Sequence, residues 1–263
     1  MSASPTASRS LPIAAGFWFA VTAFGQAAFL AYIAGFYGPT LVTGDFQRWT
    51  RNENLGHGYV PGDDRGNLLF AVHVGLAAIL TLGGLLQLLP ALRRRAPVLH
   101  RWTGRIFMVS ALAAALGGAA LTWLRHDANS SLINDIAITG NALAILICAA
   151  FAWRTALKRD FVNHQAWATR LFLVVSGVWF LRVGMVAWGI AGQGWGIASF
   201  FDVWVFGAYL VPLAIYEIYR RAKRADRLAQ RAAAGLLALT GLVILAGSLG
   251  AAAFMWLPLL QAT

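Results

Sequence analysis

Three kinds of residue are scarce in this chain of 263 residues, and each scarcity excludes a class of protein. Charged residues make up only 12% of the chain, against roughly 25% in soluble globular domains, while 59% of the residues are hydrophobic. A soluble fold would need charge on its exposed helix faces, so this composition predicts helices that face lipid. The single cysteine, Cys148, lies in an apolar run, which excludes intrachain disulfides and thiolate metal clusters.

Lysine is the third scarce residue. The only two, Lys158 and Lys223, lie outside the apolar runs, which argues against a retinal Schiff base. The sequence also contains no phosphate-binding Walker loop and no His-Glu-x-x-His motif. Within the apolar runs, carboxylates are confined to Asp135, Asp202 and Glu217, all close to an end. A proton-coupled transporter with an acidic group at the membrane midplane is therefore disfavoured.

Seven runs of mostly apolar residues are long enough to cross a bilayer, which requires about 20 residues. They are residues 11–36, 67–91, 101–124, 132–154, 164–189, 198–219 and 232–258. The mean hydropathy of +0.64 agrees with this pattern. We therefore expect an all-α membrane bundle over residues 11–258, flanked by short tails at residues 1–10 and 259–263.

The positive charges gather on one side of these seven spans when the N-terminus is placed in the cytoplasm. Sixteen of the 21 lysines and arginines then lie on the inner side: Arg9, Arg93, Arg94, Arg95, Arg101, Arg105, Arg154, Lys158, Arg159, Arg170, Arg220, Arg221, Lys223, Arg224, Arg227 and Arg231. The positive-inside rule thus predicts a cytoplasmic N-terminus and an outer C-terminus. The net charge of +11 follows from this topology, and we expect the lipid bilayer, not nucleic acid, as the partner.

The connection between the first two spans, residues 37–66, is longer than the topology requires. It is rich in glycine, aspartate, asparagine and aromatic residues, and it lies on the outer side. Two interpretations stay open: the loop folds over the outer face as a lid, or it is simply solvated.

Polar residues inside a bilayer are costly, so each one is a candidate site. Four of them on three predicted helices fall at a similar depth in the outer half: His73, Asp135, Asn141 and Arg182. His57 and His126 lie close enough in sequence to reach the mouth of such an outer pocket. The alternatives are that Arg182 extends to the outer interface and that His73 is a neutral histidine packed between helices.

A second layer of polar residues lies at the predicted inner surface, where two spans begin. Its members are His100, Arg101, Arg105, His164, Trp167 and Arg170. Helix N-termini carry free N–H groups and partial positive charge, which suits an anion such as a propionate or phosphate. The alternative is that these residues grip lipid headgroups and set the topology.

Two redox cofactors fit the inner layer. His100 and His164 could be the axial ligands of a haem b, with neighbouring arginines balancing the propionates. Cytochromes usually place such histidines deeper in the membrane, whereas these lie at its edge. A quinone headgroup, held by histidine and arginine, requires less depth. No metal site beyond the haem ligands is expected.

The stretch from His73 to Arg182 resembles an uncharacterised family of bacterial polytopic membrane proteins. The resemblance rests on the following segments: His73-Val74-Gly75, Gly84-Leu85-Leu86-Gln87, Leu99-His100-Arg101-Trp102-Thr103-Gly104-Arg105, His164-Gln165-Ala166-Trp167-Ala168-Thr169-Arg170 and Leu181-Arg182. It departs at Ala168, where the family has methionine, and at Phe172, where tyrosine is common. It implies a shared site around His73, His100, His164, Arg105, Arg170 and Arg182, without naming an activity. The Leu99–Trp102 segment is also similar to a short motif of transmembrane cytochromes b.

Three functions follow as hypotheses. The first is an inner-membrane protein that binds a redox cofactor or small ligand of haem b or quinone type. The second is a non-catalytic subunit or assembly factor that works with other membrane subunits. The third is a transporter of a small solute or ion that uses the outer pocket around His73 and Arg182.

Overall fold

The computed structural model describes residues 9–52, 58–126, 131–192 and 196–261, so His57 lies outside the described residues. The elements follow in the order α1 (Ser10–Thr43), the 3₁₀ helix η1 (Phe46–Arg51), α2 (Asp64–Leu88), α3 (Pro90–Arg95), α4 (Pro97–Leu124), α5 (Leu132–Leu157), α6 (Phe161–Val175), α7 (Gly177–Ile190), α8 (Ile197–Ala222), α9 (Arg227–Ala251), the π-helical turn η3 (Ala252–Trp256) and α10 (Leu257–Gln261). The described part of the chain contains no strand, which confirms the all-α class.

Six helices of the described chain are long and apolar enough to cross a membrane. They are α1, α2, α4, α5, α8, and α9 continued through η3 and α10. The pair α6 and α7 makes a seventh span if it is counted as one crossing. The protein is therefore a multi-pass membrane bundle, as predicted. The direction of crossing stays a prediction, and we use it only to name the two ends: the inner end carries Arg93–Arg95 and Arg220–Arg224, and the outer end is opposite.

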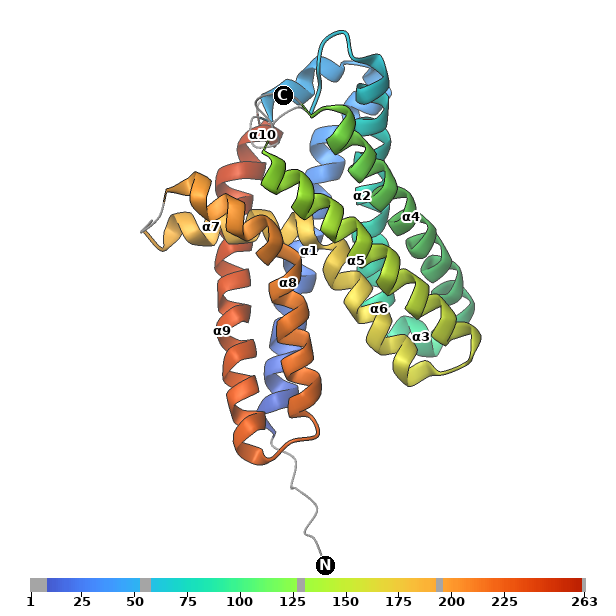
Figure 1. Ribbon diagram of the computed structural model, residues 1–263, viewed down its shortest axis with the longest axis vertical. Helices are drawn as coiled ribbons and strands as arrows, with labels where there is room; N and C mark the ends of the chain where they lie inside the picture. The colour runs from blue at the N-terminus through green and yellow to red at the C-terminus, as the bar shows by residue number, and fades with distance from the viewer. Residues whose placement is uncertain (1–8, 53–57, 127–130, 193–195, 262–263) are drawn as a thin grey trace, which may run out of the picture.

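The span predicted as one straight helix over residues 164–189 is broken at Ser176. The two halves, α6 and α7, meet there at an angle of 56°. A serine followed by Gly177 is a common cause of sharp helix bends. The N–H of Ser176 still bonds the oxygen of Phe172, and the N–H of Trp179 bonds the oxygen of Ser176, both at 3.0 Å. As Figure 1 shows, α7 consequently lies across the bundle, and the depth expected for Arg182 from a straight helix does not apply.

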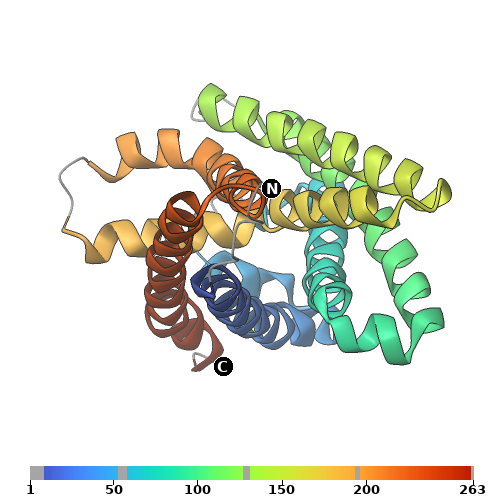
Figure 2. The same ribbon diagram turned by 90° about the horizontal axis from the view of Figure 1, so that it is seen from below.

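The arrangement of α1, α7, α8 and α9 is clear from the end of the bundle. Seen from below, α1 and α9 lie side by side, while α7 and the start of α8 extend outward as a hairpin (Figure 2). Small residues permit the close contacts of α9, as expected for a membrane helix. A side-chain carbon at Gly241 would lie 2.6 Å from Phe17 of α1, and one at Gly247 would lie 2.6 Å from Val183 of α7.

The outer end of α1 is longer than predicted, because the helix continues through Pro39 to Thr43. Tertiary contacts hold this extension. Trp49 of η1 is only 1% exposed, and its indole N–H donates to the hydroxyl of Thr40. Asn52 donates to the hydroxyls of Tyr32, at 2.6 Å, and Tyr37, at 2.8 Å. The described part of the long connection therefore folds over the end of α1.

Candidate functional site

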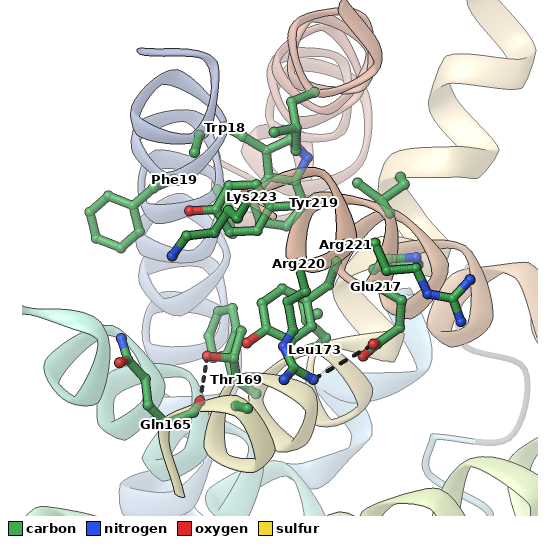
Figure 3. A pocket seen from close by; sticks show the side chains of 18 of the residues that line it. Trp18, Phe19, Gln165, Thr169, Leu173, Glu217, Tyr219, Arg220, Arg221 and Lys223 are labelled. Atoms are coloured by element: carbon green, nitrogen blue, oxygen red, sulfur yellow. Dashed lines mark hydrogen bonds and ion pairs between the residues drawn. The ribbon is translucent and has the colours of Figure 1, made fainter. Parts of the chain in front are cut away.

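A pocket of about 830 Å³ opens between α1, α6 and α8 near the inner end of the bundle (Figure 3). Its apolar lining comes from all three helices, from the end of α2 and from the middle of α9: Ala15, Trp18, Phe19, Leu88, Val162, Ala166, Phe172, Leu173, Pro212, Ile215 and Leu237. The volume is within the range of small-molecule and cofactor sites in proteins.

Two polar groups on α1 line this pocket without a hydrogen-bond partner among the described residues. They are the buried indole N–H of Trp18 and the hydroxyl of Thr22, which is 1% exposed. A threonine in a helix normally donates to the carbonyl one turn earlier, and Thr22 does not. Both atoms are enclosed by protein at the pocket wall. Because unpaired buried polar groups are costly, a side-chain rotation that turns either atom toward a bound molecule would gain a hydrogen bond.

One side of the pocket is polar because α6 and α8 present residues at helical spacing toward it. Gln165 and Thr169 lie four residues apart on α6, and the Thr169 hydroxyl donates to the Gln165 oxygen at 2.9 Å. On α8, Arg220 lies four residues after Tyr216 and three after Glu217, and all three line the same side of the pocket. These side chains give the pocket hydrogen-bonding groups beside its apolar lining.

Positive charge dominates the rim. Four cationic side chains from the end of α8 and the turn that follows it line the rim: Arg220, Arg221, Lys223 and Arg224. In Figure 3, Lys223 reaches toward α1, whereas Arg221 points away from it. The carboxylate of Glu217 is the acidic group in the pocket lining, and it lies 3.7 Å from the guanidinium of Arg220. The rim therefore favours a headgroup that carries hydrogen-bond acceptors or negative charge.

The predicted inner layer lies partly behind this pocket. Arg170 pairs with Glu217 through Nη2 at 2.6 Å and Nε at 2.8 Å, and its guanidinium lies 4.5 Å from the ring centre of Trp167. Trp167 in turn stacks on Phe151 of α5 at 4.6 Å. Arg170 and Trp167 thus position the α8 wall of the pocket without lining it.

The two predicted haem ligands also lie outside the pocket lining. The Nδ1 of His164 lies 2.9 Å from the carbonyl oxygen of Ala152, which joins α6 to α5. His100 interacts electrostatically with His164, and its Nδ1 has no hydrogen-bond partner among the described residues. Arg101 and Arg105 are exposed, and the guanidinium of Arg105 lies 5.0 Å from the ring centre of Trp102, next along the chain from Arg101.

Two of the four predicted outer-layer residues hold neighbouring segments together. His73 of α2 faces α4, where its ring packs against Gly118 and interacts with the backbone of Ala114. Asp135 pairs with Nδ1 of His126 at 2.5 Å. These contacts give each residue a role in helix packing.

The other two lie at the bent helix pair. The amide nitrogen of Asn141 approaches Gly177 at the start of α7. Arg182, one turn further along α7, donates to the oxygen of Val178 at 2.9 Å and lies 5.4 Å from the ring centre of Phe29. Among the described residues, no hydrogen bond, ion pair or ring contact joins any two of the four outer-layer residues.

Sequence reasoning missed Trp18, Thr22 and the α8 wall as site residues. The basic run Arg220–Arg224 was visible, but the positive-inside rule accounts for it fully. Trp18 and Thr22 are ordinary residues of an apolar helix, and only their missing hydrogen bonds set them apart.

Comparison with known families gives one match. A family described as "Predicted membrane protein (DUF2306)" matches residues 70–220, which include most of α2, all of α3 to α7 and most of α8. No curated protein and no solved structure gives a significant match.

Proposed function

Because the chain belongs to the predicted membrane protein family DUF2306, whose description names no activity, we propose its function from the pocket alone. The protein binds an amphipathic molecule of quinone type, with an acceptor-bearing headgroup and a long apolar tail, in the pocket between α1, α6 and α8. The bilayer concerned is the bacterial inner membrane, since the distribution of arginines agrees with a cytoplasmic N-terminus.

The observation that carries this proposal is the pair of unpaired groups on α1, Trp18 Nε1 and Thr22 Oγ1, in the wall of a largely apolar pocket. Both can donate hydrogen bonds, and the carbonyl oxygens of a quinone are acceptors. Trp18, Phe19 and Phe172 contribute aromatic side chains to the lining, which suits a flat ring.

A haem is supported less well by the same lining. Haem iron takes histidine, cysteine, methionine or tyrosine ligands, and of these only tyrosines, Tyr216 and Tyr219, line the pocket. His164 uses one ring nitrogen to join α6 to α5. If a haem were bound between His100 and His164, the purified protein would show its absorption bands, and His100→Ala and His164→Ala would each abolish them. We expect no such bands.

The cationic rim also suits the phosphate of a lipid, which shares an acceptor-bearing head and an apolar tail with a quinone. The two sources differ in what an organic extract contains. Purification in mild detergent, followed by solvent extraction and mass spectrometry, should recover about one quinone per protein. A preparation with phospholipid only would assign the pocket to lipid, and one with neither would overturn the proposal.

Binding in this pocket can be tested by filling it with a larger side chain, with a matched control outside the pocket. Ala15 lines the pocket, whereas Ala20 on the same helix is exposed on the outside of the bundle. We expect Ala15→Phe to lose the extracted molecule and Ala20→Phe to retain it. Equal retention in both variants would contradict binding in this pocket.

The hydrogen-bonding role is tested by removing one donor at a time, with valine matching the shape of threonine and phenylalanine keeping an aromatic ring in place of Trp18. Trp18→Phe and Thr22→Val should each weaken quinone binding about five- to tenfold, the usual effect of one lost hydrogen bond. Thr240→Val is the control, because that hydroxyl already bonds the oxygen of Leu236 at 2.8 Å and lies outside the pocket lining. Unchanged affinity in both α1 variants would refute the assignment of the headgroup to these donors.

A further inference from the structure

Arg182 is a buried cation without a carboxylate partner among the described residues. Its side chain is 8% exposed, and its hydrogen bond to the oxygen of Val178 uses one of five N–H groups. A guanidinium in a membrane interior normally pairs with an acid or faces water, because burying an uncompensated charge is costly. A bound anion would therefore compensate the charge of Arg182.

The tyrosine hydroxyls near Arg182 already accept hydrogen bonds from Asn52, so what they can offer a ligand is a donor. The two amide hydrogens of Asn52 point to the hydroxyls of Tyr32 and Tyr37, and these hydroxyls lie 3.5 Å apart. Arg182 lies near both tyrosines. The two hydroxyls can share only one of their hydrogens with each other, so the other hydrogen has no acceptor among the described residues.

Two more buried donors belong to the same cluster. Trp256 is 2% exposed, and its indole N–H has no partner among the described residues. Its ring lies 5.5 Å from that of Phe29, which Arg182 also faces, and 5.7 Å from that of Tyr32. Gln26, one turn before Phe29 on α1, is likewise 2% exposed with an unpaired Nε2.

We propose that this outer cluster, formed by Gln26, Phe29, Tyr32, Arg182 and Trp256, binds a small monovalent anion. An inorganic anion or the carboxylate of a small molecule would neutralise Arg182 and accept hydrogen bonds from Trp256 and Gln26. The π-helical turn Ala252–Trp256, a kind of irregularity often found at functional sites, places the Trp256 ring against α1. The site is separate from the inner pocket, whose lining shares none of these residues.

The experiment is a titration of the purified full-length protein with anions at constant ionic strength. Gluconate, a larger anion, serves as the background salt, and chloride, nitrate, formate and acetate replace it stepwise. Unfolding is followed with a thiol-reactive dye on Cys148, the single and buried cysteine. At a hundredfold excess over Kd, the Tm should rise by roughly 5–10 °C. A larger rise with formate and acetate indicates a carboxylate ligand, and one with chloride and nitrate indicates an inorganic anion.

Substitutions test whether the rise in Tm comes from anion binding at this cluster. Arg182→Gln should abolish the rise, and Trp256→Phe, which keeps an aromatic ring without the N–H, should weaken the apparent affinity about tenfold. Arg105→Gln removes the same charge from an exposed arginine that also lies over a ring, and it should respond like the wild type. The proposal is overturned if the wild type does not distinguish small anions from gluconate, or if Trp256→Phe responds as the wild type does. The Trp256→Phe variant tests anion binding at the cluster even if Arg182→Gln does not fold.

Discussion

The close contact between α9 and α7 at Gly247 predicts that one added methyl group, in Gly247→Ala, destabilises the protein. A side-chain carbon at Gly247 would lie 2.6 Å from Cγ1 of Val183 and would also meet the backbone oxygen of Val183. Carbon atoms pack at about 3.5–4.0 Å, so α7 and α9 would have to separate by about 1 Å. Because a backbone atom is involved, a change of rotamer cannot relieve the overlap. Overpacking of this kind costs about 1–3 kcal/mol.

Gly235 on the same helix provides the control of opposite sign. It is exposed, and no atom lies within 4 Å of a side-chain carbon built there. Gly235→Ala should therefore stabilise the helix by about 0.5–1 kcal/mol, through backbone entropy alone.

The assay is thermal unfolding in one detergent, with a thiol-reactive dye reporting exposure of Cys148. For a chain of this size, 1 kcal/mol shifts the Tm by about 2–4 °C. Gly247→Ala should lower the Tm by about 3–10 °C, and Gly235→Ala should raise it by a few degrees. A Gly247→Ala protein as stable as the wild type would show that α7 does not pack on α9 as described.

Three further changes test other parts of the fold. The Asp63 carboxyl accepts a hydrogen bond from a backbone N–H of α2 and pairs with Arg125 at 2.9 Å, and both hold its pKa below the usual range. Its stabilisation is present above the ordinary aspartate pKa, about 3.9, and is lost as the pH falls through the folded-state pKa. The difference in Tm between wild type and Asp63→Asn should thus vanish at low pH, and a constant difference would refute the pairing. Glu217→Gln leaves Arg170 without its carboxylate and should cost about 1–2 kcal/mol in chemical denaturation, whereas no cost would refute the ion pair. Trp49→Ala should cost about 3–5 kcal/mol, because this ring is 1% exposed, and a neutral result would mean that η1 does not cap the bundle.

The sequence predicts most of the fold because apolar runs of bilayer length have few alternatives to membrane helices. The bend at Ser176 escapes this reasoning, since residues 164–189 remain apolar on both sides of it. The extension of α1 through Pro39 was missed for a related reason. Local signals favour a helix end there, and the contacts of Thr40 with Trp49 override them.

The candidate site could be predicted only in part. Arg170 and Trp167 were expected at the inner surface, and they brace one wall of the pocket through Glu217 and Phe151. The pocket itself forms where α1, α6 and α8 meet, and such contacts between distant segments leave no periodic signal in one sequence. Histidine, the most conspicuous residue type in the sequence, lies outside the pocket lining.

The central claim, that an amphipathic molecule occupies the inner pocket, is tested most directly by an experimental density map of the protein purified from its own membrane in mild detergent. The account predicts elongated density between Trp18, Phe172 and Leu237, with its head within hydrogen-bond distance of Trp18 Nε1 and Thr22 Oγ1. A pocket closed by its own side chains, or one holding only water, would contradict it.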